Sequence, residues 1–347
     1  MPHMSILAHL APLLTNQIEN VATDALAHLL SQYDFVADAF IEHISSVGIA
    51  LPKKLTVKTQ AKWQDAAIPD LVGLDEEGRH ILIVESKFWA PLTPNQPATY
   101  IERLPYDTPA LLLFIAPASR TSTLWQELLR RCDPLHVNRQ SQQETAPQFQ
   151  TLRLNNNHTL ALTSWESLLA VLYAAARQAG DEYASGDIWQ LQSLCARIDA
   201  EAFKPLSEDE IKSPTEMRKK QFRGLVDELV TLLADAGIAY IAGYRATPGP
   251  DYYKRYMSLQ GVPNWCIEYN ERLRRQHPPT SLWLTVYGKP SLSGLLSGLA
   301  SVGFHQGKQF LIPLRIPSGV EKEAVLTDLL SQVTEVSRQL VNQRIEP

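Results

Sequence analysis

Apolar residues in the first half of the chain follow two spacings, one typical of helices and the other of strands. From Ile18 to Leu29 they recur on one helical face, which predicts an amphipathic helix over residues 18–33. A continuous apolar run from Ile81 to Val84 predicts a strand that is buried on both faces. The same reasoning predicts helices over 36–44, 95–104 and 122–131, strands over 55–63, 68–74, 81–88 and 110–116, and a final strand and helix within 158–178. This order predicts an α/β domain in which a mixed sheet is flanked by helices.

A second set of elements follows in the C-terminal half. Leucines between Leu225 and Leu233 share one helical face, which predicts a long helix over 216–236. The segment from Ser318 to Glu321 is a capping-box pattern and predicts a last helix that continues to about residue 342. Between these two helices we expect strands over 239–244, 256–260, 265–269, 282–287 and 309–315. The C-terminal half is therefore expected to be an α+β domain with its own core.

Two polar segments are candidates for the boundary between these domains. The stretch 178–187 is small and polar, and 204–216 is rich in charged residues and proline. We place the boundary in the first stretch, which gives a domain over 1–178 and an accessory domain over 179–347. The helix expected over 188–200 can belong to either side.

Composition limits the class of protein. A chain of 347 residues, 45% hydrophobic and 20% charged, is typical of a soluble protein of about two domains. It holds three cysteines without metal-binding spacing, no apolar run long enough to span a bilayer and no signal-peptide pattern, so we expect a reduced, cytoplasmic protein without a membrane partner. The formal net charge of −5 argues against nucleic-acid affinity over the whole surface. There is no P-loop, GxGxxG or GxSxG motif, which argues against the common ATPases, dehydrogenases and serine hydrolases.

The apolar strand over 81–88 ends in charged residues, which is unusual for a core strand. Side chains alternate across a strand, so Glu85 and Lys87 point to one face and Ser86 points to the other. In a hairpin, Asp70 at the start of the preceding strand can lie beside Glu85. Mg²⁺ prefers oxygen ligands and commonly uses one or two carboxylates together with substrate phosphate. Two carboxylates and an ammonium group at one sheet end therefore suit metal-assisted hydrolysis of a phosphodiester.

These residues resemble the motif of the PD-(D/E)XK nuclease superfamily: Pro69-Asp70 precedes an apolar run that ends in Glu85-Ser86-Lys87. Gln96 and Tyr100 add a spacing similar to the QxxxY motif of RecB-like members. The resemblance covers about residues 15–175 and implies a restriction-endonuclease-like αβββαβ core. It implies that Asp70, Glu85 and the carbonyl of Ser86 bind Mg²⁺ or Mn²⁺, that Lys87 assists the attacking water, and that Gln96 and Tyr100 lie beside the site.

Many members of that superfamily also carry an acidic residue on the first helix, and Glu19 is the candidate here. On a helical wheel Glu19 lies nearly in line with Leu26 and Leu30, on the apolar face, where a carboxylate is costly. The alternative is an ordinary glutamate in the first turn, which the helix dipole favours.

Three lysines that share one face of their expected strand, Lys54, Lys58 and Lys62, are candidates for weak contacts with nucleic-acid phosphates. The alternative is an edge strand that its lysines protect from pairing with other chains. Basic clusters at 219–223 and 272–275 are more often solvated surfaces, and the aromatic residues over 252–269 are more often core than base-stacking platforms.

The sequence therefore predicts a metal-dependent nuclease, with DNA rather than RNA as the default substrate. A restriction or anti-phage defence role in bacteria follows only by analogy with relatives. The accessory domain is expected to bind substrate, a partner protein or a second copy of the chain. The alternative is a nuclease-like module that binds nucleic acid or assembles with other proteins without cutting.

Overall fold

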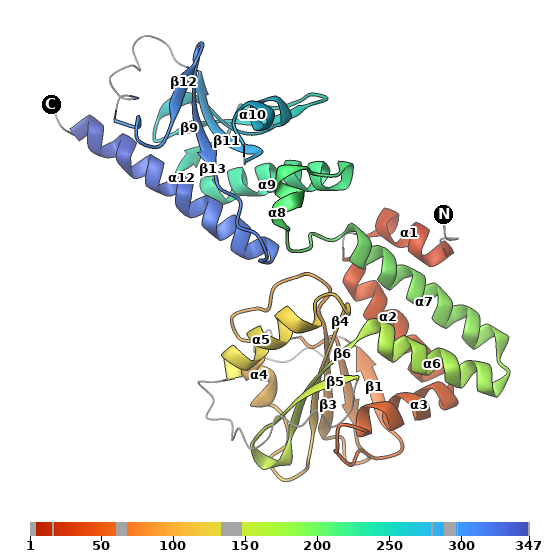
Figure 1. Ribbon diagram of the computed structural model, residues 1–347. Helices are drawn as coiled ribbons and strands as arrows, with labels where there is room; N and C mark the ends of the chain where they lie inside the picture. Colours follow the sequence, from red (N-terminus) through yellow and green to blue (C-terminus); the bar gives the residue numbers. More distant parts are fainter. Residues whose placement is uncertain are drawn as a thin grey trace. The chain divides into compact units, whose positions relative to one another are not determined.

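The computed structural model describes residues 5–15, 17–59, 68–132, 148–278, 280–287, 296 and 298–345. The chain divides into two compact units, Met1–Ala202 and Phe203–Pro347. Each unit has its own sheet (Figure 1). Each also has its own hydrophobic core. None of the helices within the described ranges is long and apolar enough to cross a bilayer.

The first unit is built on a six-stranded mixed sheet with the strand order β1-β2-β3-β4-β6-β5. Strands β1 to β3 form an antiparallel meander, and β3, β4 and β6 run parallel to one another. Strand β5 closes the far edge antiparallel to β6. The strands are β1 (Thr56–Thr59), β2 (Leu71–Leu74), β3 (His80–Ser86), β4 (Leu111–Ala116), β5 (Phe149–Arg153) and β6 (Thr159–Ser164). The expected mixed sheet flanked by helices, and with it the α/β class, is confirmed.

Helices cover both faces of this sheet. Leu82 and Val84 of β3 pack with helices on one face, and Ile81 and Ile83 pack with helices on the other. This is why the β3 sequence is continuously apolar instead of alternating. The first face holds α1 (Ile6–Leu14), α2 (Ile18–Gln32), α3 (Asp34–Ser45), α6 (Trp165–Ala179) and α7 (Glu182–Glu201). The second face holds α4 (Ala98–Ile101) and α5 (Thr121–Cys132).

Several elements differ from the expectation. The helix expected over 95–104 is only the short α4, Ala98–Ile101. Strand β1 ends at Thr59, and residues 60–67 lie outside the described part of the chain. One helix and one strand of the first unit were not predicted: α1, which contains Pro12, and the edge strand β5, whose burial pattern does not alternate. Neither carries a clean periodic signal.

The boundary between the units lies after Ala202, later than the expected position after residue 178. Helix α7 belongs to the first unit because its apolar residues, Ala184 to Leu194, join the core there. The polar stretch that suggested a linker comprises the end of α6, a tight turn at Gly180 and Asp181, and the first residues of α7. Gly180 ends α6 with a φ of 70°, and Asp181 caps α7 by accepting a hydrogen bond from the N–H of Ala184 at 2.9 Å.

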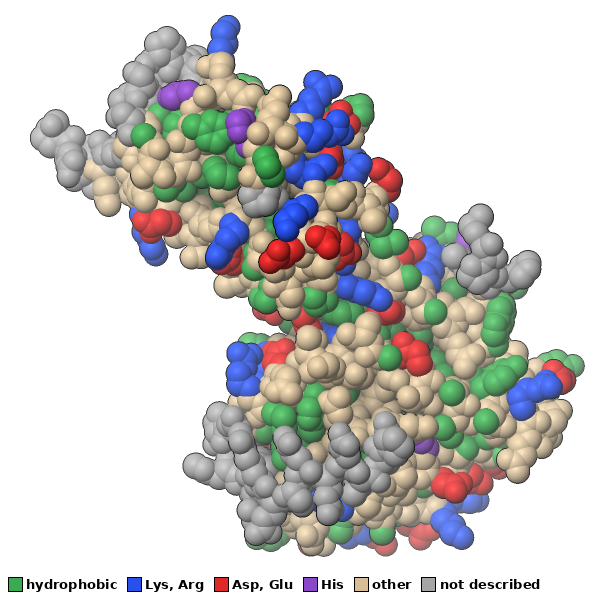
Figure 2. All heavy atoms as spheres, viewed as in Figure 1, with side chains coloured by type: hydrophobic (Ala, Val, Ile, Leu, Met, Phe, Trp, Pro, Cys, Tyr) green, Lys and Arg blue, Asp and Glu red, His purple; other side chains and the backbone are tan. Residues whose placement is uncertain are grey.

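The second unit is built on an antiparallel sheet with the strand order β12-β13-β11-β10-β9-β7, and β8 also pairs with β9. The strands are β7 (Ala239–Tyr240), β8 (Ala246–Pro248), β9 (Tyr252–Leu259), β10 (Val262–Asn270), β11 (Leu282–Tyr287), β12 (Phe304–Gln306) and β13 (Gln309–Leu314). Helices α9 (Glu216–Asp235) and α12 (Lys322–Ile345) pack on one sheet face. Two short helices, α8 (Glu208–Lys212) and α10 (Glu271–Gln276), complete the unit. Lysine and arginine side chains gather around α10 and the start of α9 (Figure 2).

A buried ion pair lies on the other face of this sheet. Lys254 of β9 and Glu268 of β10 are cross-strand partners, and their charged atoms are 2.7 Å apart. Thr285 donates a hydrogen bond to the second oxygen of Glu268 at 2.8 Å, and Lys254 donates to the hydroxyl of Tyr287 at 2.6 Å. Burial alone lowers the pKa of Lys254, but the Glu268 carboxylate reverses this effect and raises the pKa above its usual value.

Because of this pair, we expect the loss of stability on alanine substitution to differ greatly between two acidic residues of the second unit. Glu268→Ala leaves Lys254 buried without its partner, so we expect the free energy of unfolding to fall by about 3–5 kcal/mol. Asp251→Ala removes an exposed partner of Arg272, 3.6 Å away, and is expected to cost less than about 1 kcal/mol. Urea unfolding of the full chain checks both values. Equal losses in the two variants would contradict the role given to the buried pair.

Candidate active site

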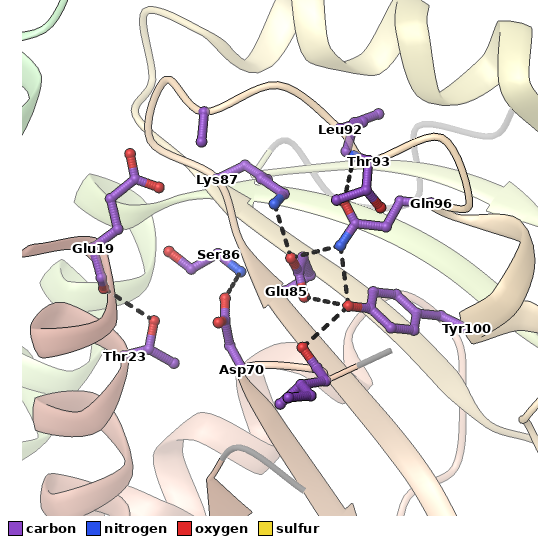
Figure 3. Close-up of polar contacts among 12 residues, drawn as sticks. Glu19, Thr23, Asp70, Glu85, Ser86, Lys87, Leu92, Thr93, Gln96 and Tyr100 are labelled. Atoms are coloured by element: carbon purple, nitrogen blue, oxygen red, sulfur yellow. Dashed lines mark hydrogen bonds and ion pairs between the residues drawn. The ribbon is translucent and has the colours of Figure 1, made fainter. Parts of the chain in front are cut away.

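The pairing of β2 with β3 brings the two candidate metal-binding carboxylates together. Leu71 pairs with Val84 in an antiparallel register, so the next pair along the two chains is Asp70 and Glu85. The N–H of Ser86 donates a hydrogen bond to Oδ2 of Asp70 at 2.7 Å (Figure 3). The backbone of β3 continues to pair with β4, because the N–H of Lys87 donates to the carbonyl of Ile115 at 2.8 Å. The site therefore lies at one end of the central strands.

Glu85 is the centre of a buried hydrogen-bond network. Its Oε1 lies 3.0 Å from Nζ of Lys87 and accepts a hydrogen bond from Nε2 of Gln96 at 2.7 Å. Its Oε2 accepts a hydrogen bond from the hydroxyl of Tyr100 at 3.0 Å. The Glu85 side chain is only 5% exposed, and a buried carboxylate needs such donors to remain charged. Glu85, Lys87, Gln96 and Tyr100 thus form one connected group, with Glu85 and Lys87 on one face as strand alternation predicted and with Gln96 and Tyr100 beside them as the resemblance implied.

Gln96 and Tyr100 reach Glu85 from the turn before α4 and from α4 itself. Nε2 of Gln96 also lies 3.0 Å from the hydroxyl of Tyr100, and the N–H of Thr93 donates to Oε1 of Gln96 at 3.0 Å. Burial, followed by the charge of Glu85, raises the pKa of Tyr100. Tyr100 therefore remains a neutral phenol and acts as a hydrogen-bond donor at ordinary pH.

Asp70 has an unusual electrostatic environment. Burial and the nearby charge of Glu85 raise the pKa of Asp70 to about 7, although the N–H of Ser86 and the charge of Lys87 oppose this rise. Its Oδ2 accepts the hydrogen bond from Ser86, while no described residue donates a hydrogen bond to Oδ1. An acidic group poised near neutrality, with one oxygen open to another partner, is typical of functional sites.

Glu19 approaches from α2, on the other face of the sheet. Its Oε1 accepts a hydrogen bond from the N–H of Trp89 at 3.4 Å, and its charge adds slightly to the raised pKa of Asp70. Figure 3 shows the Ser86 side chain pointing toward Glu19, away from the Glu85 network. The Ser86 hydroxyl is buried and has no hydrogen-bond partner among the described residues. A metal-binding role for Glu19 and for Ser86 remains a prediction.

The donor set limits the kind of metal centre that this site can form. Within the described ranges, no three or more His, Cys, Asp and Glu side chains lie close enough together to hold a metal ion. Asp70 and Glu85 alone fit the binding mode of Mg²⁺, which keeps several water ligands and uses one or two carboxylates with substrate phosphate. They do not fit a structural zinc site, which uses four protein ligands.

The candidate phosphate-contacting lysines do not join this network. Lys54 is exposed and precedes β1, and Lys58 is exposed on β1. Lys62 lies outside the described residues. Strand β1 is at the edge of the sheet, so the structure is compatible with an edge protected by lysines and with contacts to phosphate.

Two arginines that the sequence analysis did not single out hold the segment between Lys87 and Gln96. Arg120 is fully buried and donates hydrogen bonds to the carbonyls of Phe88, at 3.0 Å, and Ala90, at 2.8 Å. Arg131, near the end of α5, donates to the carbonyls of Leu92 and Gln96, each at 3.2 Å, and also to that of Thr93. We call this pair the arginine clamp. No local sequence pattern marks it, because its partners are backbone carbonyls more than twenty residues away.

Comparisons of the chain with protein-family models, with curated proteins and with solved structures found no match.

Proposed function

We propose that this protein is a divalent-metal-dependent nuclease that hydrolyses phosphodiester bonds. The observation that carries the proposal is the convergence of Asp70, Glu85 and Lys87 at one end of β2 and β3, with Gln96 and Tyr100 hydrogen-bonded to Glu85. Carboxylates that can hold Mg²⁺, together with an ammonium group beside them, are what phosphodiester hydrolysis requires. The proposal includes the expected restriction-endonuclease-like core, because a helix, a three-strand meander, a helix and a parallel strand occur here in that order.

The site residues have separate roles in this proposal. A bound Mg²⁺ or Mn²⁺ would polarise a phosphoryl oxygen and lower the pKa of a water ligand. Asp70 and Glu85 would hold the ion, the Ser86 carbonyl would be a further ligand, and Glu19 would add a carboxylate from α2. Lys87 would orient the attacking water and offset the negative charge that develops on the phosphate. Gln96 and Tyr100 would fix the rotamer of Glu85 through their two hydrogen bonds.

DNA is the proposed substrate because most proteins with this motif act on DNA. A defence role in bacteria is proposed by the same analogy. The second unit would bring the substrate, a partner protein or a second copy of the chain to the site. Cutting both strands of a duplex would suit a homodimer, in which each copy contributes one site.

A metal titration combined with a cleavage screen tests the proposed function. Calorimetry with Mn²⁺ is expected to show binding to the wild type and binding at least tenfold weaker to Asp70→Asn, which keeps the shape of the side chain but loses its charge. Linear and circular DNA and RNA, single- and double-stranded, are then incubated with Mg²⁺, Mn²⁺ or a chelator. Cleavage is expected with either metal and none with the chelator. Cleavage that persists in excess chelator would overturn the proposal.

One observation favours the second candidate, a nuclease-like module that binds without cutting. Lys87, Gln96 and Tyr100 already satisfy both oxygens of Glu85, as they would in a purely structural network. The same titration separates the two functions. A wild type that binds no Mn²⁺ and cuts no substrate would favour the module.

A further inference from the structure

Two basic clusters about fifty residues apart in the sequence lie together on the second unit. Arg223 of α9 donates hydrogen bonds to the carbonyls of Gly249 and Pro250, at 3.2 and 3.1 Å. The carbonyl of the next residue, Asp251, accepts a hydrogen bond from the N–H of Glu271 at 2.9 Å. Glu271 is the first residue of α10. These contacts hold the start of α9 beside α10, where side chains of lysine and arginine gather (Figure 2).

We call this region the basic surface, and its cations are Lys219, Lys220, Arg223, Arg272, Arg274 and Arg275. A buried carboxylate organises it. Glu271 is 3% exposed, and its Oε2 lies 2.9 Å from Arg274 and 3.9 Å from Arg275. The pKa of Lys219 is raised mainly by its hydrogen bond with Glu216, and the charges of Glu271 and Arg275 also contribute to that pKa. The two clusters therefore share one electrostatic environment.

Positive charge exceeds negative charge on the basic surface. Among the described residues, its six cations have three carboxylate partners: Glu216, Asp251 and Glu271. The side chains of Arg272 and Arg275 are 77% and 65% exposed. Lys220 is exposed and forms no ion pair with a described residue. Cations this exposed are accessible to a large anionic partner.

The two units also differ in charge. Residues 203–347 carry 18 lysines and arginines against 15 aspartates and glutamates, whereas residues 1–202 carry 14 against 22. The acidic net charge of the chain thus comes from the unit that holds the candidate active site. That unit is poorly suited to attract a polyanion over its whole surface, whereas the second unit carries a net positive charge that favours one.

We infer that the basic surface binds the phosphate backbone of DNA without reading its sequence. The choice of DNA as the partner rests on the proposed nuclease function. Arginine and lysine side chains are the usual contacts to phosphate oxygens, and such contacts position a protein on nucleic acid without specifying sequence. The second unit would then hold DNA for the site on the first unit.

The inference is tested by measuring how a short fluorescent DNA duplex binds to the full chain, with fluorescence anisotropy as the readout and excess chelator present. The test variant is Lys220→Ala/Arg272→Ala/Arg275→Ala. The matched control is Lys308→Ala/Arg315→Ala/Arg338→Ala, which removes three exposed cations elsewhere on the second unit. We expect the test variant to bind at least about tenfold more weakly and its salt dependence, the slope of log K against log salt, to fall by about 2–3. We expect the control to stay within about twofold of the wild type.

Equal losses in the two triple variants, or no salt-dependent binding by the wild type, would overturn the inference. So would binding of polyglutamate but not of DNA, which would indicate an acidic protein partner instead. The outcome does not depend on catalysis. If the chain binds DNA through the basic surface but never cuts it, only the nuclease proposal is refuted. If the chain cuts DNA and the test variant loses no affinity, only this inference is refuted.

Discussion

Lys87→Ala is expected to lower the rate of metal-dependent DNA cleavage by at least about 100-fold. Lys87 is the only candidate catalytic group among the described residues that carries a positive charge beside both carboxylates, 3.0 Å from Glu85. Removing a group that orients the nucleophile and stabilises developing charge typically costs about 10²–10³ in rate. Initial rates on the best substrate from the screen, at saturating Mg²⁺, measure the loss.

Stability must be separated from chemistry in this variant, because Lys87 is mostly buried. Lys87→Met keeps the aliphatic stem, and Gln96 and Tyr100 still donate to Glu85, so we expect this variant to fold and to be equally inactive. Lys308→Ala removes an exposed lysine from the second unit, outside both the candidate active site and the basic surface, and is expected to keep nearly full activity. A folded Lys87→Met protein that cleaves at the wild-type rate would contradict the role given to Lys87.

Asp70→Asn is expected to make the metal-free protein more stable at neutral pH. The pKa of Asp70 in the folded protein is raised to about 7, above its value in the unfolded chain. The stability contributed by its protonated form is therefore complete below about pH 4 and is lost as the pH rises to about 7. Between about pH 5 and pH 7.5, the free energy of unfolding of the wild type should fall by on the order of 2 kcal/mol relative to that of Asp70→Asn. Urea unfolding with chelator at the two pH values measures this difference.

Two further measurements make this expectation specific. Mn²⁺ at neutral pH should stabilise the wild type and not Asp70→Asn, because a bound cation favours the ionised carboxylate. Asp75 supplies a control of opposite sign. Burial acts to raise the pKa of Asp75, but hydrogen bonds and the charge of Arg79 hold this pKa below its usual value. Asp75→Asn is therefore expected to destabilise the protein at neutral pH. An Asp70→Asn variant less stable than the wild type at pH 7.5 would contradict the assigned environment.

The core of the candidate site could be predicted because local rules determine it. Strand alternation placed Glu85 and Lys87 on one face, and hairpin geometry placed Asp70 opposite Glu85. Gln96 was expected on a helix and lies instead in the turn before α4. It still donates a hydrogen bond to Glu85, and Tyr100 of α4 donates to the same carboxylate. The chemistry proposed for these residues has still to be tested.

Other features could not be predicted because they depend on contacts between distant segments. The arginine clamp binds backbone carbonyls, which any sequence provides, so the residues around Arg120 and Arg131 do not predict it. The polar stretch near Asp181 resembles a linker, yet it caps a helix that packs into the first core. The basic surface requires the start of α9 and α10 to be neighbours, which only the contacts around Asp251 reveal.

The hydrogen bond between Ser86 and Asp70 has a consequence for how this site can change during evolution. The described pairing of β2 with β3 begins at Leu71, and beyond it the N–H of Ser86 donates to a side-chain oxygen of Asp70 instead of a backbone carbonyl. Position 70 therefore carries a structural constraint in addition to its proposed chemistry. A descendant that lost the chemistry would still be selected to keep a short hydrogen-bond acceptor there, such as asparagine. Asparagine beside an intact Glu85 and Lys87 would then mark a lineage that kept the fold and gave up the proposed metal binding.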